Sequence, residues 1–202
     1  MPWPVPPEWT SETAFLIGGG PSVGDVDLSV LRNRRVIAIN NSWELVPRAT
    51  VLYFCDEKWW GWNGAKVAEG FEGRYIVTPS QLIDDPRGRL VKLTGATGLE
   101  TDPCGLKHGS NSGYQAINLA YHFGAKRIVL LGYDMHTTNG THWHAGHPTT
   151  KAKPYAATLR DAMLPKFTSL VEPLETAGVE VVNATPGSAL KCWPIRPLED
   201  LI

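Results

Sequence analysis

Four of the six histidines in this 202-residue chain lie within one 14-residue segment that begins at Asp134, DMHTTNGTHWHAGH. Imidazole groups titrate near neutral pH, so His136, His142 and His147 are candidates for general acid or base chemistry. A loop of histidines and threonines can also contact phosphate. Zinc binding by His142, His144 and His147 with Asp134 is the alternative, but these spacings match no strong zinc motif. We therefore assign His136, His142, His147 and Asp134 as catalytic candidates, and no metal ligand.

A glycine-rich turn, GGGPS, follows the apolar run AFLI near the N-terminus. Backbone amides in such a turn can approach an anion closely when it leads from a buried strand toward a helix. The turn is neither the GxGxxG dinucleotide fingerprint nor a GxxxxGK[ST] P-loop. Gly18, Gly20, Pro21 and Ser22 are therefore candidate phosphate-binding residues, with a plain tight turn as the alternative.

Other polar residues follow apolar runs, where strands are expected to end. Asn40 comes directly after VIAI and Asp56 comes shortly after VLYF. Asn111, Ser112 and Gly113 stand at the start of a helical pattern, where a side chain ordinarily caps the helix and free amides can hold a phosphate or carboxylate. Ligands of open parallel sheets lie outside the carboxyl ends of the strands. We expect these residues to line one binding site.

Three tryptophans, Trp59, Trp60 and Trp62, follow Asp56 in the sequence DEKWWGW. Three indoles so close together cannot all point into one core direction. At least one is a candidate platform for a sugar or base. A hydrophobic plug between elements is the alternative.

The elements that must position these residues alternate between strand and helix. Apolar runs predict strands at residues 14–17, 36–39, 51–54, 127–131 and 179–182, with weaker candidates at 74–78 and 90–93. Apolar stripes predict helices at residues 112–123 and 164–177, each followed by a glycine cap. Buried strands without period-two alternation favour a parallel sheet covered on both faces. We predict a Rossmann-like, three-layer α/β fold with a mainly parallel central sheet in a single domain, residues 13–202, after an extended arm rich in proline and tryptophan at residues 1–12.

Composition limits the partners and the compartment. Nineteen basic and 20 acidic residues give a net charge of -1, without the basic surplus of a general nucleic-acid binder. No apolar run approaches the roughly 20 residues of a membrane span, and the N-terminus does not resemble a signal peptide. The three cysteines lack CxxC spacing, which favours a reducing compartment. We expect a cytoplasmic protein, and leave open whether it forms a homo-oligomer.

Four segments resemble, in order, the bacterial CMP-sialic-acid-dependent sialyltransferases of the lipooligosaccharide type. They are FLIGGGPSV with AINNSW, LYFCDEKWW, NSGYQAINLAYHFGAKRIVLLGYDM, and VVNATPGSAL. The same segments resemble the related DUF115 proteins, which include an archaeal-type 6-hydroxymethylpterin diphosphokinase. The resemblance covers about half of the chain, and the compact size is similar to that of small phage-type members.

The resemblance implies a Rossmann-like nucleotide site. The positions that fall on the family's nucleotide-contacting residues are Gly18, Gly20, Pro21, Ser22, Asn40, Ser112 and Gly113, while Asp56 suits the DUF115 proteins. Asp134 falls on the family's G-x-D, and His147 resembles the histidine that acts as the catalytic base. Gly19 stands where the family has asparagine. His136 and either His142 or Trp143 stand where it has the two tyrosines that assist phosphate departure.

The resemblance implies three alternative functions. The first is a glycosyltransferase with a CMP-type nucleotide-sugar donor and a small-molecule or glycan acceptor, in which His147 is the base and His136 or His142 stabilises the departing phosphate. The second is diphosphokinase-like transfer of pyrophosphate from ATP, with Mg²⁺ held by Asp56 and Asp134. The third is a non-catalytic nucleotide-binding phage accessory protein. No firm cofactor is assigned to the first function.

Overall fold

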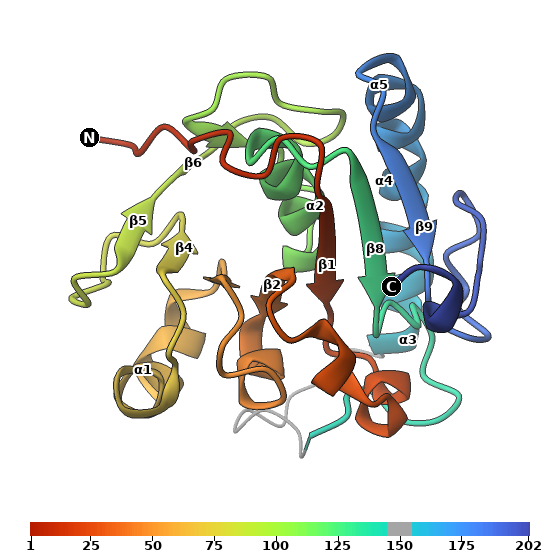
Figure 1. The fold of residues 1–202 in the computed structure, drawn as a ribbon, viewed down its shortest axis with the longest axis horizontal. Helices are drawn as coiled ribbons and strands as arrows, with labels where there is room; N and C mark the ends of the chain where they lie inside the picture. Colours follow the sequence, from red (N-terminus) through yellow and green to blue (C-terminus); the bar gives the residue numbers. More distant parts are fainter. Residues whose placement is uncertain (145–154) are drawn as a thin grey trace.

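The structure is a computed structural model whose described residues are 1–144 and 155–202, and it is built around a parallel sheet of seven strands (Figure 1). The spatial order is β5-β4-β3-β2-β1-β8-β9. The strands are β1 (Thr13–Ile17), β2 (Arg35–Ile39), β3 (Val51–Tyr53), β4 (Tyr75–Thr78), β5 (Gly88–Leu90), β8 (Arg127–Leu131) and β9 (Glu180–Asn183). Two short strands, β6 (Lys92–Leu93) and β7 (Gly105–Leu106), form a separate parallel pair. The predicted parallel α/β fold is confirmed.

Helices cover both faces of the sheet and give the molecule three layers (Figure 1). One face packs against α2 (Ser112–His122), α4 (Leu164–Phe167) and α5 (Val171–Thr176). The other packs against α1 (Glu57–Gly70) and the 3-10 turns Pro21–Asp25, Leu28–Leu31 and Asn40–Glu44. Successive residues of a strand point to opposite faces. Leu16 of β1 therefore enters the first core and Phe15 the second, and both are fully buried.

Two helical regions differ from the sequence prediction. The sequence predicts no helix over α1, because glycines and the tryptophan run hide its apolar stripe. The predicted helix at residues 164–177 is divided into α4, a 3-10 turn at Thr168–Leu170 and α5, and it is preceded by α3 (Tyr155–Thr158) and a π-helical turn at Leu159–Met163. Pro165 explains the wide turn, because it has no amide hydrogen for the Asp161 carbonyl and its ring displaces that carbonyl.

The arm at residues 1–12 packs onto the domain near β5 and α2 (Figure 1). Trp3 N donates to Leu90 O at 2.6 Å, and Trp9 N donates to Phe123 O at 2.7 Å. The buried Trp9 indole stacks on the Phe123 ring with centroids 4.1 Å apart. Burial of a large aromatic side chain contributes strongly to folding. Trp9 thus anchors the arm in the hydrophobic core.

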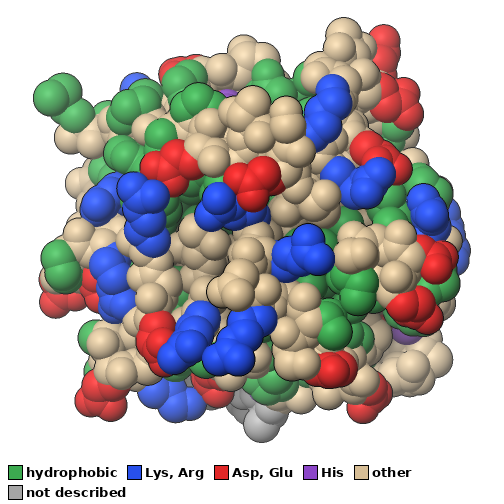
Figure 2. Space-filling model, viewed as in Figure 1, with side chains coloured by type: hydrophobic (Ala, Val, Ile, Leu, Met, Phe, Trp, Pro, Cys, Tyr) green, Lys and Arg blue, Asp and Glu red, His purple; other side chains and the backbone are tan. Residues whose placement is uncertain are grey.

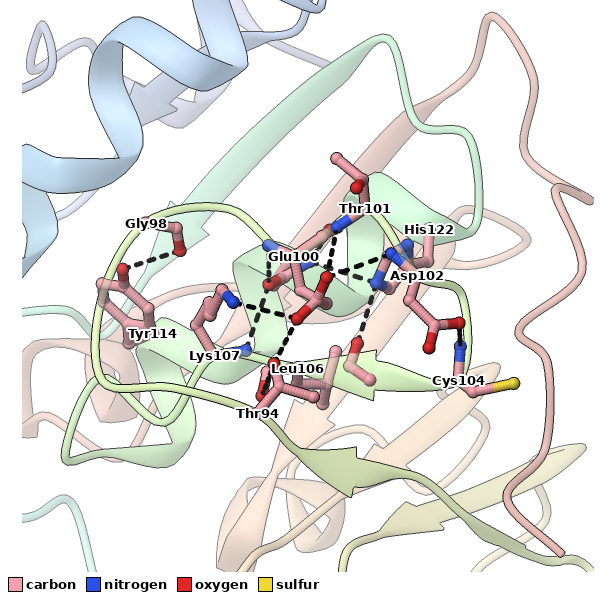
Figure 3. Close-up of polar contacts among 12 residues, drawn as sticks. Thr94, Gly98, Glu100, Thr101, Asp102, Cys104, Leu106, Lys107, Tyr114 and His122 are labelled. Carbon is pink, nitrogen blue, oxygen red and sulfur yellow. Dashed lines mark hydrogen bonds and ion pairs between the residues drawn. The ribbon is translucent and has the colours of Figure 1, made fainter.

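A polar network centred on Glu100 fastens the segment before α2 to that helix (Figure 3). The Glu100 carboxylate accepts hydrogen bonds from the Thr94 hydroxyl and from Lys107 Nζ, the latter at 3.0 Å. These bonds lower the pKa of Glu100 to about 2. The Glu100 backbone donates to Asn118 Oδ1 at 2.9 Å and accepts from Asn118 Nδ2 at 3.0 Å. Because Asn118 belongs to α2, this network fixes the helix that carries the predicted anion site.

Charged side chains of both signs are interspersed on the face shown in Figure 2, in keeping with the near-neutral net charge. Surface ion pairs include Arg35 with Glu12 at 2.8 Å and Arg127 with Glu180 at 2.6 Å. Across residues 1–144 and 155–202, no helix combines the length and the apolar character needed to cross a bilayer.

Candidate functional site

A pocket opens at the carboxyl edge of the sheet, where the strand order changes direction. At this switch point β1 pairs with β2 on one side and with β8 on the other. The loops after β1 and β8 contact each other closely, because Gly18 N donates to Leu131 O at 2.7 Å and Gly20 N donates to Gly132 O at 2.9 Å. Ligands of open α/β sheets bind at such switch points. The pocket is therefore the first candidate for the functional site.

The pocket brings together most of the residues that the sequence singles out. Those that line it are Gly18, Gly20, Asn40, Asn111, Ser112, Gly113, Asp134, His136 and His142. Gly19, Asn41, Tyr133, His144 and Tyr155 line it as well. The loops after β1, β2 and β8 and the start of α2 thus contribute to one site.

Three backbone amides make the pocket suitable for an anion. Those of Gly19, Ser112 and Gly113 have no acceptor within the described chain, and all three residues line the pocket. Asn111 Oδ1 accepts from the Tyr114 amide at 2.8 Å and so caps α2 without occupying the two amides before it. The N-terminus of a helix also carries partial positive charge. A phosphate or a carboxylate is the ligand that this arrangement favours.

Asp134 lies at the pocket, but its carboxylate is used within the protein. Oδ1 accepts from Ser22 N at 3.2 Å and Oδ2 from Ser22 Oγ at 2.8 Å, and the residue is only 3% exposed. The bonds tie the loop after β1 to the loop after β8. Pro21 and Ser22, predicted to face the nucleotide phosphates, lie outside the pocket lining because they begin a 3-10 turn that is bound to Asp134.

Asp56 also lies outside the pocket lining. It is exposed and caps α1, with Oδ1 accepting from Lys58 N at 2.9 Å. Its neighbour Cys55 instead contacts the site, with Sγ 3.2 Å from Ser112 Oγ, and burial raises the pKa of the thiol. Asp56 and Asp134 are thus each engaged elsewhere rather than paired for Mg²⁺. Among the described residues no group of three or more histidines, cysteines or acidic residues converges on one point.

His142 occupies the space above Gly19. Its Nδ1 is 3.2 Å from Gly19 O, and because a carbonyl only accepts hydrogen bonds, Nδ1 carries the proton. A Cβ at position 19 would lie 3.3 Å from that nitrogen, so a larger side chain would displace the imidazole. The ring also stacks on His144 at 5.2 Å and lies 5.6 Å from the Tyr155 ring. Glycine at position 19 therefore makes room for His142 in the site.

The structure describes one of the two remaining catalytic candidates, His136 and His147. His136 lines the pocket, and its Nδ1 accepts from Thr138 N at 3.3 Å. His147 lies outside the described residues. The sequence interpretation missed Tyr155, whose pKa is raised by burial, so the phenol keeps its proton and can donate a hydrogen bond. Tyr155 stands four residues before Leu159, and this helical spacing is the sequence signal that could have revealed it.

The tryptophan run has two roles in the structure. Trp59 is 2% exposed and donates from Nε1 to Asn41 Oδ1 at 2.6 Å. Trp60 is buried and stacks on Phe54 with centroids 5.1 Å apart. Both belong to the core, as the alternative interpretation requires. Trp62 is 41% exposed and stays a candidate platform.

Comparison with known proteins shows which solved structures share this fold. No protein-family model and no curated protein matches the sequence. The sialyltransferase CstII from Campylobacter jejuni, in complex with the substrate analogue cytidine-5'-monophosphate, matches with a TM-score of 0.57 at 14% identity, over 93% of this chain and 86% of that one. The chain shares the fold of this enzyme. A variant of the same enzyme in complex with CMP matches with a TM-score of 0.56 at 16% identity, over 92% and 87% of the two chains.

The shared fold extends over nearly the whole of this chain. At this level of identity the likeness concerns the fold. The resemblance to DUF115 and phage-type proteins stays a prediction from the sequence.

Proposed function

We propose that this chain is a nucleotide-dependent glycosyltransferase that takes a CMP-type donor. One observation carries the proposal: Gly19, Ser112 and Gly113, whose amides have no acceptor within the described chain, line a pocket at the switch point of a fold shared with CMP-bound sialyltransferases. The nucleotide phosphate occupies this cradle. Asn40 lines the same pocket and offers its side-chain amide to the ribose or the base.

Transfer requires help for the departing phosphate. A bond forms between the acceptor oxygen and the anomeric carbon while the bond from that carbon to a phosphate oxygen breaks. Negative charge grows on the phosphate, so donors placed around it lower the barrier. His136, His142 and Tyr155 line the pocket and supply these donors, and the Tyr155 phenol stays protonated because burial raises its pKa.

The acceptor hydroxyl must lose a proton as it attacks, and we assign the base to His147 from its place in the sequence AGHP. His147→Ala should lower kcat by two or more orders of magnitude while the donor affinity changes little, because the base acts on the acceptor. Metal analysis of untagged protein is the companion measurement. Near-stoichiometric zinc would contradict the general-base role, since the histidines would then be ligands.

Nucleotide binding is the first experiment. Thermal unfolding should be followed with CMP, CDP, UDP and ATP, each with Mg²⁺ and with EDTA. At a CMP concentration of about 100 Kd we expect the midpoint to rise by roughly 5–10 °C, from about 2.7 kcal/mol of linkage, equally in EDTA. An ATP response that needs Mg²⁺ would favour the diphosphokinase-like reading, for which Asp56 and Asp134 are poorly placed. CMP binding without release of CMP from a CMP-sugar would favour the non-catalytic reading.

A further inference from the structure

A lysine lies just beyond the helical residues that line the candidate nucleotide pocket. Tyr155, Leu159 and Met163 line the pocket at four-residue spacing. The π-helical turn at Leu159–Met163 lies within this segment, and α4 follows it directly. Lys166 of α4 comes three residues after Met163.

The Lys166 side chain reaches the N-terminal end of α2. Its Nζ donates a hydrogen bond to the hydroxyl of Ser110. Ser110 directly precedes Asn111, which caps α2 and lines the pocket. Lys166 and Ser110 are not among the lining residues, so the ammonium group lies just beyond them, beside the end of α2 that carries the free Ser112 and Gly113 amides.

The charge of Lys166 has no counterpart in the described chain. Lys166 is half-buried, and its bonded partner is a neutral hydroxyl. Lys107, which is similarly shielded, pairs with the Glu100 carboxylate at 3.0 Å. None of the ion pairs among the described residues includes Lys166. Hydrogen bonds between an ammonium group and an anion are stronger than neutral ones, so an anionic ligand would gain from this position.

We propose that Lys166 binds a second negative charge of the ligand, beyond the first phosphate of the nucleotide. The inference rests on the proposed function, in which the amides of Ser112 and Gly113 hold that first phosphate. The site then selects ligands that carry another anionic group beside it. This group is either a carboxylate on the transferred sugar or a second phosphate of a nucleoside diphosphate.

Calorimetric titration with CMP, CDP and CMP-sialic acid tests the proposal on four proteins: the unaltered chain, Lys166→Met, Lys166→Arg and Lys126→Met. Lys126 is exposed and lies just before β8, at the opposite edge of the sheet, so its variant controls for the loss of one positive charge. Lys166→Met should weaken binding of the ligand that carries the second anionic group, CDP or CMP-sialic acid, about tenfold. Binding of CMP, which has only the one phosphate, should weaken less than threefold. Lys166→Arg should retain most of the affinity. Selective loss for CDP identifies a phosphate, and selective loss for CMP-sialic acid identifies a carboxylate.

Equal weakening of all three ligands, or unchanged affinities in a folded Lys166→Met variant, would overturn the role of Lys166. The thermal unfolding midpoint establishes that the variant is folded. Failure of the unaltered chain to bind any of the three ligands would instead overturn the proposed function, so the two failures are distinguishable.

Discussion

Ser22 and Asp134 are joined by two hydrogen bonds across 112 positions of the sequence, one from the Ser22 amide at 3.2 Å and one from its hydroxyl at 2.8 Å. Each carboxylate oxygen receives one bond. Asp134 is held further by its backbone, since its carbonyl accepts from Ala189 N at 2.8 Å. A residue that the sequence suggests for catalysis thus fixes the distance between two loops of the pocket.

Removing the Ser22 hydroxyl should therefore lower stability. Ser22→Ala leaves one oxygen of the buried Asp134 carboxylate without its donor, and we expect the free energy of unfolding to fall by about 1–3 kcal/mol. Urea denaturation gives the value directly. Ser29→Ala, at an exposed serine of the next turn, should change it by less than about 0.5 kcal/mol. If Ser22→Ala keeps its stability but loses turnover, the result would instead support a catalytic role for Asp134.

Neighbouring glycines of the turn should respond differently to alanine. A Cβ at Gly20 would lie 1.9 Å from Asp134 Oδ2 and 2.6 Å from Gly132 O, so Gly20→Ala should destabilise the fold by more than about 2 kcal/mol. A Cβ at Gly19 would lie 3.3 Å from His142 Nδ1, so Gly19→Ala should stay folded and alter nucleotide binding. Urea denaturation and calorimetry separate the two effects.

Gly61 supplies the control for these glycine variants. It lies within α1 and a Cβ there would meet nothing within 4 Å, so Gly61→Ala should raise stability by about 0.5–1 kcal/mol through helix propensity. Equal effects at positions 20 and 61 would contradict the close approach of the two pocket loops.

Stability should fall in two stages as the pH is lowered. Burial lowers the pKa of His122, whose Nε2 donates to Gly105 O at 2.9 Å. The unfolded chain therefore binds more protons as the pH falls through the ordinary histidine pKa of 6.5, and the folded state loses stability there. The Glu100 pKa is lowered from 4.5 to about 2, so its contribution is present above 4.5 and is lost between those values.

Urea denaturation at several pH values checks both stages. His122→Gln should flatten the dependence just below pH 6.5, and Glu100→Gln should flatten the dependence below pH 4.5. His108→Gln, at an exposed histidine, is the control for the substitution itself. An unaltered slope in His122→Gln would show that other groups cause the loss.

Asn41 should be needed for the packing of α1. Asn41→Ala removes the acceptor of the Trp59 indole N–H, now 2.6 Å away, and leaves a buried donor unsatisfied at a cost of about 1–3 kcal/mol. Trp59→Phe removes the indole donor. In a Trp59→Phe background, Asn41→Ala should therefore lower the free energy of unfolding by less than it does in the unaltered chain. A double-mutant cycle measured by denaturation gives this coupling. Zero coupling would mean that the bond does not stabilise the fold.

The sequence indicates the strands well because a parallel sheet covered on both faces requires continuous apolar runs. Runs such as AFLI and RIVLL are therefore direct evidence of β1 and β8. Helices depend on a stripe that other residues can hide. In α1 the stripe is obscured by tryptophans and glycines, and the turn at Leu159–Met163 depends on Pro165, whose effect extends backward along the chain.

Prediction of the candidate site from the sequence is limited for a different reason. Polar residues after strands indicate which edge holds the ligand, but a carboxylate suits a helix cap as well as a ligand. Asp56 caps α1, and Asp134 binds Ser22. Only the three-dimensional arrangement decides between these uses. Tyr155 reaches the pocket from a helix whose path the sequence does not reveal.

The central place of β1 has a consequence for how the chain matures. Its partner on one side, β2, follows soon after it, but its other partner is β8, and Asp134 is synthesised 112 residues after Ser22. A nascent chain that ends before β8 holds β1 with one edge unpaired and the GGGPS turn without its anchor. Pairing between such distant segments is slow, because the intervening loop must be closed first. A ligand bound in this pocket would therefore report completed folding, and its presence during synthesis would favour the finished chain over its unfinished forms.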